Sequence, residues 1–269
     1  MTALSWRKPL VMLVAAVVAI MPALPQTIPP SALQQAVPGD LKRVVDLSYA
    51  INDKLVAWPG DDRVFESKVN GTVEKDGYFT RSFWMLEHYG THLDAPAHFP
   101  PGKATVDQIP AEKLFGPAVV IDVQAESAKN ADYLLSVERI ERWEKQHGEI
   151  PEHAIVLLRT GWASRWPDAV KYRNQDALGK MHFPGYSLEA AKLLLARHVN
   201  GLGCDTLSID YGASADFPVH HEILGAGLYQ LENLANLSQL PETGAYLLVA
   251  PIKLEGGSGG PARVFALLP

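Results

Sequence analysis

The chain has 269 residues, of which 47% are hydrophobic and 20% are charged. This composition can fill a substantial core in one or two domains and excludes an intrinsically disordered chain. The formal net charge of −6 offers no basic surface for nucleic acid or an anionic membrane, so we expect neither as a partner.

The first thirty residues are predicted to be a secretory leader. Arg7 and Lys8 precede twelve apolar residues, LVMLVAAVVAIM, and a proline-rich stretch follows as far as Pro30. This is the layout of a signal peptide, and the run is shorter than the roughly 20 residues that span a bilayer. We therefore favour cleavage at about residues 26–30 over a membrane anchor, and expect a periplasmic or secreted protein without stable membrane insertion.

Leader removal makes the predicted mature chain more acidic. The loss of Arg7 and Lys8 reduces the 24 basic residues to 22 against 30 acidic residues, a net charge of −8. We find no internal repeat and no long linker in the remainder, so residues 31–269 are predicted to form a single domain.

Six short apolar segments, bounded by Gly, Pro or Asp, are predicted to be strands. They are residues 43–51, 78–86, 117–123, 153–161, 245–255 and 262–269. Segments 117–123 and 153–161 contain the continuous apolar runs AVVIDV and AIVLL. Such runs are typical of strands that are covered on both faces, so we expect helices or a second sheet to pack over them.

Two amphipathic segments are predicted to be helices. Ser136 is a candidate N-cap for a helix that ends near residue 147, and Ser187 opens a second helix that ends near residue 199. A shorter helix is expected after His220. Strands interspersed with helices predict a mixed α/β fold.

The segment HYGTHLDAPAHF, residues 88–99, places His88, His92, Asp94 and His98 within eleven positions. In an extended chain these even-numbered residues point to one face. Imidazoles with a carboxylate suit a divalent transition metal such as zinc or manganese better than calcium or magnesium. A hydrogen-bonded loop without metal is the alternative, but the density of ligands favours a metal site.

The same segment has to bend. A fully extended chain of ten residues spans roughly 33 Å, which is far too long for ligands that surround one ion. Gly90 and Pro96 both oppose a helix interior. We therefore predict a curled segment that turns at these two residues, with Thr91 also shaping the loop.

A second patch of candidate ligands, His220, His221, Glu222 and Glu232, lies in FPVHHEILGAGLYQLENLANL. His221 and Glu222 are equally consistent with solvated residues at a helix start. Glu232 sits among apolar residues, where an unpaired carboxylate would cost several kcal/mol. It needs a partner, and a metal ion would serve.

Other features have narrower interpretations. Asp205 and Asp210 are predicted either to orient a ligating imidazole or to form turns. Cys204, the only cysteine, is predicted to be a small buried hydrophobe without a disulfide partner. GGSGG at 256–260 favours a tight turn between two strands over a phosphate cradle.

HYGTHLDAPAHF resembles the His-x-Gly-Thr-His-x-Asp-x-Pro-x-His signature of the cyclase-type metal hydrolases, the family of bacterial kynurenine formamidase and isatin hydrolase. The resemblance extends to VVDLSYAI, WPGD, HHEILGAG, LENL and APIKLEGGSGGPARVFAL. It implies an α/β fold of the swivelling β/β/α type, with mixed sheets and flanking helices, and a homodimer or homotetramer.

The resemblance also implies the metal ligands and their roles. One ion, zinc or manganese, would be held by His88, His92 and Asp94, and Asp94 would bridge to a second ion held by His98, His220 and Glu232. The twelve-residue separation from Glu232 selects His220 over His221. We expect isatin hydrolase-like members with one ion to lack a carboxylate at the Glu232 position, so its presence favours the two-metal, formamidase-like branch.

The expected activity is a metal-dependent hydrolase that cleaves the C–N bond of an N-formyl aromatic amine. His98 or Glu232 would carry the proton to the departing nitrogen, and Trp58, Phe83 and Phe99, with Trp84 as a further candidate, would wall an aromatic pocket. One alternative is isatin-like opening of a cyclic amide or lactone. The other is an exported metal-binding protein without catalysis.

Overall fold

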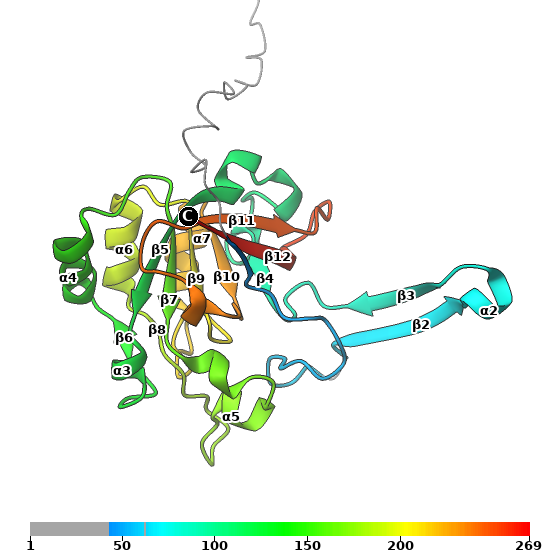
Figure 1. The fold of residues 1–269 in the computed structure, drawn as a ribbon. Helices are drawn as coiled ribbons and strands as arrows, with labels where there is room; N and C mark the ends of the chain where they lie inside the picture. Colours follow the sequence, from blue (N-terminus) through cyan, green and yellow to red (C-terminus); the bar gives the residue numbers. More distant parts are fainter. Residues whose placement is uncertain (1–42, 62) are drawn as a thin grey trace, which may run out of the picture.

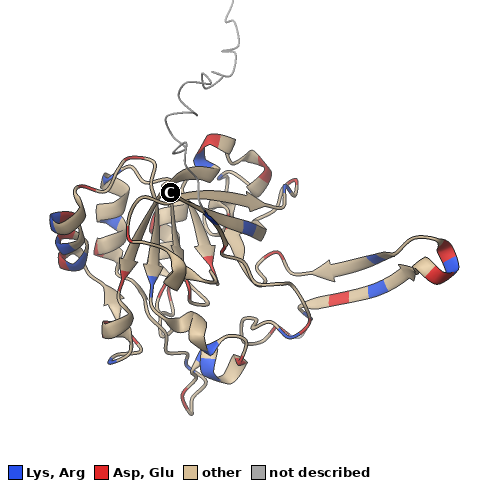
Figure 2. Cartoon of the chain, in the orientation of Figure 1, with Lys and Arg blue, Asp and Glu red and all other residues tan. Residues whose placement is uncertain are grey.

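The computed structural model describes residues 43–61 and 63–269 (Figure 1). The predicted leader lies outside the described residues. Within the described part of the chain, no helix is both long enough and apolar enough to cross a membrane. Acidic and basic residues are interspersed over the ribbon (Figure 2).

Eight strands form the central sheet. Their order is β1 (Arg43–Asp46), β12 (Gly259–Leu268), β11 (Tyr246–Pro251), β5 (Phe115–Asp122), β7 (Ile155–Arg159), β9 (Gly201–Cys204), β10 (Tyr229–Glu232) and β4 (His92–Asp94). The start of β12 also pairs with β4, which closes the sheet into a barrel. The neighbours β5, β7, β9 and β10 run parallel, and the other pairs are antiparallel. The predicted mixed α/β fold is confirmed.

Two smaller sheets lie outside the barrel. Strands β2 (Phe65–Gly71) and β3 (Thr80–Met85), connected through the short helix α2 (Val73–Asp76), form a hairpin that projects from the body (Figure 1). Strands β6 (Leu134–Leu135) and β8 (Gly185–Tyr186) form a parallel pair.

The α-helices that follow are α3 (Gln124–Ser127), α4 (Val137–His147), α5 (Ala169–Arg173), α6 (Leu188–Ala196) and α7 (Pro218–Gly225). Short 3-10 helices occur at Pro96–His98 (η1), Val106–Gln108, Ala111–Leu114, Trp162–Arg165 and Leu237–Gln239. α4, α6 and α7 contribute side chains to one hydrophobic cluster on the outside of the barrel.

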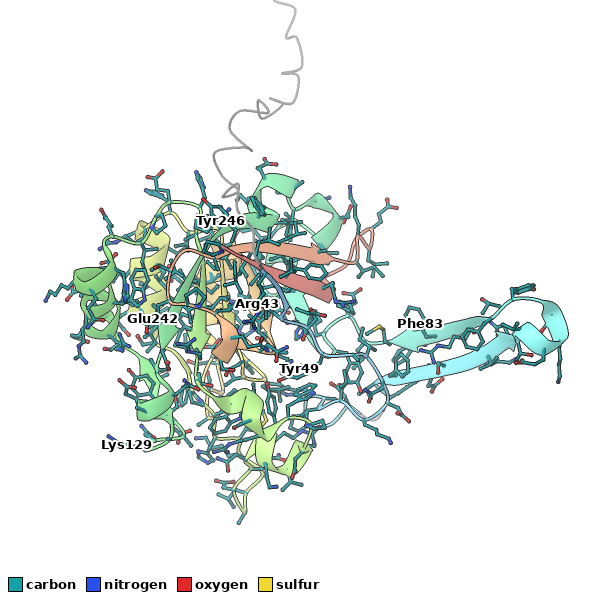
Figure 3. The ribbon with its side chains drawn as sticks, viewed as in Figure 1. Arg43, Tyr49, Phe83, Lys129, Glu242 and Tyr246 are labelled. Carbon is teal, nitrogen blue, oxygen red and sulfur yellow. The ribbon has the colours of Figure 1, made fainter. Side chains whose placement is uncertain are left out.

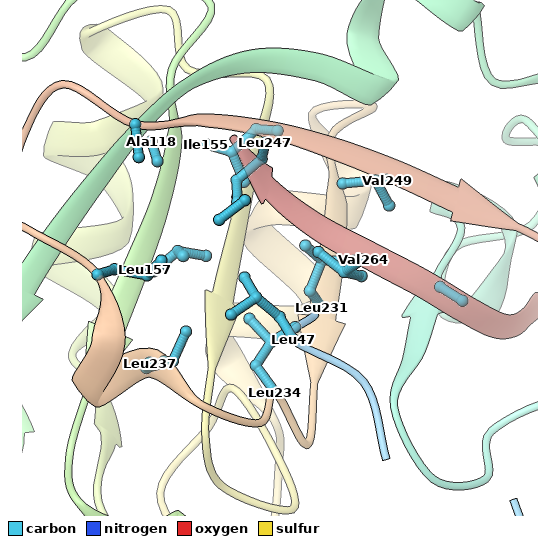
Figure 4. Packing of buried hydrophobic residues seen from close by; sticks show 14 of the residues in the cluster. Leu47, Ala118, Ile155, Leu157, Leu231, Leu234, Leu237, Leu247, Val249 and Val264 are labelled. Atoms are coloured by element: carbon cyan, nitrogen blue, oxygen red, sulfur yellow. The ribbon is translucent and has the colours of Figure 1, made fainter. Parts of the chain in front are cut away.

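Strand alternation divides the core between the two faces of the sheet. Val120 and Leu157 point into the cluster inside the barrel, where Leu47, Leu231 and Val264 also pack (Figure 4). The neighbours of these two residues along β5 and β7 point outward, toward α4, α6 and α7. Both faces are therefore covered, as the continuous apolar runs predict.

The helix predictions are largely confirmed. Ser136 caps α4 by accepting a hydrogen bond from the Arg139 N–H, and Ser187 caps α6 in the same way. α6 ends at Ala196, three residues earlier than expected, and His198 follows with φ of 54°, which is incompatible with a continuing helix. α7 begins at Pro218, so His220 lies inside the helix that was expected to follow it.

All six predicted strands are present, but the interpretation of GGSGG is only partly right. Residues 256–258 belong to the connection between β11 and β12, as expected of a link between strands. Gly259 and Gly260 instead begin β12 and pair with β4. The predicted turn is present at Gly256, which has φ of 74° while the Gly257 N–H donates to the Leu254 carbonyl, and the long-range pairing accounts for Gly259 and Gly260.

Candidate metal centre

The centre of the site lies on the outer face of β4 and β10. These strands are antiparallel, and Glu232 lies opposite His92 in the register. Leu93 and Leu231 point into the barrel core. Because successive side chains alternate, His92, Asp94 and Glu232 emerge together on the other face.

The signature segment curls at the two predicted residues. Gly90 has φ of +68°, a left-handed conformation that favours glycine, and a Cβ there would lie 2.9 Å from Leu55 Cδ1. Pro96 begins η1, which turns His98 back toward the strand. The rings of His88 and His98 consequently stack with their centroids 3.9 Å apart.

Helix α7 supplies His220 from the opposite side. The Asp210 carboxylate accepts hydrogen bonds from the Val219 and His220 backbone N–H groups and lies 2.6 Å from His220 Nδ1. This fixes the imidazole with Nε2 toward the cluster, so the interpretation of Asp210 as an orienting partner is confirmed. His221, one residue later, is exposed.

The ligand atoms converge on Asp94. Its Oδ1 lies 2.6 Å from His88 Nδ1 and 3.2 Å from His92 Nε2, and its Oδ2 lies 3.4 Å from His220 Nε2. Glu232 spans the other side, 3.5 Å from His92 Nε2 and 3.3 Å from His220 Nε2. Two overlapping groups can each hold an ion: His88 with His92 and Asp94, and Asp94 with His98 and His220.

Electrostatics make this cluster attractive to cations. Burial alone would lower the pKa of His92, but the carboxylates of Asp94 and Glu232 raise it to about 9. His220 behaves alike, since Asp210, Asp94 and Glu232 raise its pKa well above the ordinary value despite its burial. The carboxylates thus hold protons on the imidazoles, and a divalent cation would displace those protons.

His98 differs from the other imidazoles. Burial lowers its pKa to about 4, and the neighbouring histidines act in the same direction. A neutral imidazole can either ligate a metal or accept a proton.

The residues fit a divalent transition metal. Asp94 is 1% exposed, and its Oδ2 has no hydrogen-bond partner among the described residues, a costly state for a buried carboxylate oxygen. Imidazole nitrogens and carboxylate oxygens are the donor types that such metals accept. A bound ion would supply the missing partner.

The cluster forms the floor of a cavity of about 530 Å³. Trp58 and Phe99 line it, as predicted, together with Phe217. Phe217 connects the other two rings, with centroid separations of 5.9 Å to Trp58 and 5.8 Å to Phe99. The cavity therefore offers an aromatic wall of mutually inclined rings above a polar floor that suits a metal ion.

Phe83 does not line this cavity, and its predicted place there is wrong. It lies on β3 of the projecting hairpin, 59% exposed and stacked on Phe65 (Figure 3). The further candidate Trp84 is on the same strand, outside the cavity lining. The aromatic run of this strand belongs to a hairpin that leaves the body, which its composition could not reveal.

Three buried residues near the site, Thr91, Asp205 and Cys204, have structural roles. Thr91 Oγ1 donates to the Asn233 carbonyl and accepts from the Tyr49 N–H, which confirms its loop-shaping role. Asp205 accepts hydrogen bonds from Thr160 and Gly161 rather than from an imidazole. Cys204 is fully buried, as expected.

The cavity residues that the sequence did not predict include Glu87, Phe217 and Ser258. Ser258 reaches the site because β12 pairs with β4. The one local signal is the adjacent Gly259, where a Cβ would lie 2.6 Å from His88 Cε1. A glycine that permits close approach to a ligand histidine could have pointed to this loop.

Comparison with known proteins agrees with this geometry. The family model described as "Putative cyclase" matches residues 45–211. The isatin hydrolase of Roseibium aggregatum is 38% identical over 206 residues, covering 73% of this chain and 78% of the relative. The kynurenine formamidase of Salinibacter ruber is 29% identical over 223 residues, covering 82% and 95%.

A solved structure shares the fold as well. Isatin hydrolase A from Labrenzia aggregata, bound to benzyl benzoate, superposes with a TM-score of 0.78 at 38% identity, covering 84% of this chain and 93% of that one. With the ligand cluster in place, the chain belongs to the cyclase family of metal-dependent hydrolases.

Proposed function

We propose that this enzyme hydrolyses an amide bond joined to an aromatic ring, with an isatin-like cyclic amide as the first candidate substrate. The observation that carries the proposal is the convergence of imidazole and carboxylate atoms on Asp94 at the floor of an aromatic-walled cavity. A metal-binding floor can promote the attack of water on a carbonyl group. Aromatic side chains above it can pack against a planar ring of the substrate.

The choice of a cyclic amide reverses the order favoured by the sequence alone. The chain is 38% identical to an isatin hydrolase and 29% identical to a kynurenine formamidase. An N-formyl aromatic amine stays the second candidate, supported by the Glu232 carboxylate beside His92 and His220.

The metal ligands follow from the two ligand groups. His88, His92 and Asp94 would hold one ion, and Asp94, His98 and His220 would hold a second, with Glu232 as a further ligand 3.3 Å from His220 Nε2. Zinc and manganese both fit these donors. When bound, a divalent ion would lower the pKa of a coordinated water toward neutrality and polarise the substrate carbonyl.

The protein side chains would orient the substrate and move protons. Trp58, Phe99 and Phe217 pack against the aromatic ring and exclude water from it. Whichever of His98 and Glu232 does not hold an ion would accept the proton of the attacking water and return it to the departing nitrogen.

Metal analysis of the purified protein, combined with turnover of isatin and of N-formylkynurenine, tests the proposal. We expect metal-dependent hydrolysis of isatin that exceeds hydrolysis of N-formylkynurenine. The reverse order would make the formamidase assignment correct. A metal-loaded protein inactive on both substrates, and on a panel of lactams and lactones, would support the non-catalytic metal-binding alternative.

We also propose export through the predicted leader and assembly as a homodimer or homotetramer. N-terminal sequencing of protein from the periplasm or medium tests the first, and an intact Met1 would contradict it. Light scattering of the purified protein tests the second, and a monomer mass would contradict it.

A further inference from the structure

Two side chains from distant parts of the chain meet beside the His88 imidazole. Ser258 Oγ lies 2.8 Å from His88 Nε2 and 2.7 Å from Glu87 Oε2. The Ser258 backbone N–H donates to the same Glu87 oxygen at 2.8 Å. Glu87 therefore holds both the main chain and the hydroxyl of Ser258 in place.

This arrangement determines which His88 nitrogen carries a proton. A hydroxyl has one hydrogen, and a carboxylate has none to donate. The Ser258 hydrogen therefore points to Glu87, and an oxygen lone pair faces His88 Nε2. Nε2 must then be the donor to Ser258.

The opposite nitrogen consequently faces Asp94. His88 Nδ1 lies 2.6 Å from Asp94 Oδ1, and a carboxylate oxygen and an imidazole lone pair repel each other at this separation unless a proton or a metal ion is shared between them. With Nε2 committed to Ser258, Nδ1 is the nitrogen available to a metal ion.

Two further imidazoles of the cluster, those of His92 and His220, are also held by a hydrogen bond at one ring nitrogen, but to a different kind of acceptor. His92 Nδ1 donates to the Gly90 carbonyl at 2.9 Å, and His220 Nδ1 to the Asp210 carboxylate at 2.6 Å. His88 is anchored through a hydroxyl, and its side chain is 25% exposed against 4% for His92. Of the three, His88 has the least packing to fix its orientation and depends most on its hydrogen-bond partner.

We propose that Glu87 and Ser258 are positioning residues of the metal centre: they fix the tautomer and orientation of His88 and so strengthen metal binding. The inference rests on the proposed function, because it assigns His88 as a ligand. The glycine at 259 lets the loop approach the imidazole closely enough for the contact. Loss of a hydrogen bond that orients a metal-ligating histidine usually weakens metal binding by about 10- to 100-fold.

Titration of the metal-free protein with Zn²⁺ or Mn²⁺ alone, against a chromophoric chelator, tests the proposal. We expect Ser258→Ala to weaken metal binding by roughly 10-fold or more, Glu87→Gln to weaken it less, and Ser258→Thr to restore it. Ser127→Ala, a buried serine on α3 whose hydroxyl has no partner among the described residues, is the matched control and should bind as the wild type does.

Long-range ¹H–¹⁵N spectra of the Zn²⁺-loaded protein provide a second readout. The wild type should show His88 protonated at Nε2, and Ser258→Ala should shift this signal toward a mixture of tautomers. A merely structural role for Ser258 would leave the tautomer unchanged.

The possible failures are distinguishable. If the wild type binds metal but Ser258→Ala binds within twofold of it, or if Ser258→Thr is as weak as Ser258→Ala, the positioning role is wrong while the metal centre stands. If the wild type binds neither Zn²⁺ nor Mn²⁺, the proposed function fails and this inference fails with it.

Discussion

The two faces of β4 and β10 differ in chemistry although the same two short strands form both. On the inner face, Leu93 and Leu231 fill the barrel core without any exposed surface. On the outer face, His92, Asp94 and Glu232 bring ionisable groups together although all three side chains are buried. Hydrophobic burial on one face stabilises the barrel, and this stability tolerates the electrostatic cost of the other.

The largest expected effect comes from the polar face. Asp94→Asn removes the charge on which both ligand groups converge, so we expect turnover to fall at least about a thousandfold. The far-UV circular dichroism spectrum should stay native, because Leu93 still fills the core. Steady-state kinetics and circular dichroism on one preparation check this, and retained turnover would contradict the role of Asp94.

A substitution on the apolar face should reduce stability rather than metal binding or turnover. Leu231→Ala leaves a cavity in the barrel core, and we expect it to lower the free energy of unfolding by about 2–5 kcal/mol. Metal affinity of the folded fraction should change far less than in Asp94→Asn. Urea denaturation and metal titration would separate the two effects, and a stability loss below 1 kcal/mol would refute the assignment of Leu231 to the core.

Metal removal links the two faces. An ion that binds only the folded chain stabilises it by about 2.7 kcal/mol at a concentration 100 times its Kd. For a domain of this size, EDTA should therefore lower Tm by about 5–10 °C. Differential scanning fluorimetry with and without Mn²⁺ measures this shift, and an unchanged Tm would show that no ion binds.

The aromatic wall should affect substrate binding rather than stability. Phe99→Ala removes a ring from the cavity, and we expect KM to rise about tenfold, as burial of an aromatic side chain predicts. Phe83→Ala on the hairpin is the matched control and should leave KM unchanged. An equal rise for Phe83→Ala would contradict the separation of hairpin and cavity.

The smallest effect concerns an ion pair far from the site. Arg197 on the loop after α6 pairs with Glu144 on α4 at 2.8 Å, and this hydrogen bond lowers the pKa of Glu144 below its ordinary value of 4.5. Since the folded pKa is depressed, the pair stabilises the fold above pH 4.5, and this contribution is lost as pH falls through the lowered pKa.

Arg197→Gln should remove this acid-dependent contribution, less than about 1 kcal/mol for a partly exposed pair. Urea denaturation between pH 3 and pH 7 measures it. A pH profile identical to that of the wild type would show that the pair contributes nothing.

Much of the barrel could be predicted because its strands carry their own signal. β5 and β7 are continuous runs of Val, Ile and Leu, and their burial on both faces follows from that composition. β9 could not be predicted, since its sequence GLGC has little strand propensity. There, glycine is required by packing, because a Cβ at Gly201 would lie 2.6 Å from the Tyr229 ring.

The candidate site divides in the same way. His88, His92, Asp94 and His98 are close in sequence, so their chemistry and the bends between them were visible locally. Ser258 lies 170 residues from its partner His88, and only the pairing of β12 with β4 brings them together. Contacts set by long-range sheet closure leave no periodic trace in the sequence.

The outer face of β4 and β10 is proposed to bind a divalent metal through Asp94 and the histidines around it. Anomalous diffraction from crystals grown with Mn²⁺ or Zn²⁺ tests it most directly. We expect an anomalous peak at bonding distance, roughly 2.0–2.2 Å, from Asp94 and His92. A metal-soaked crystal with no peak among these side chains would contradict it.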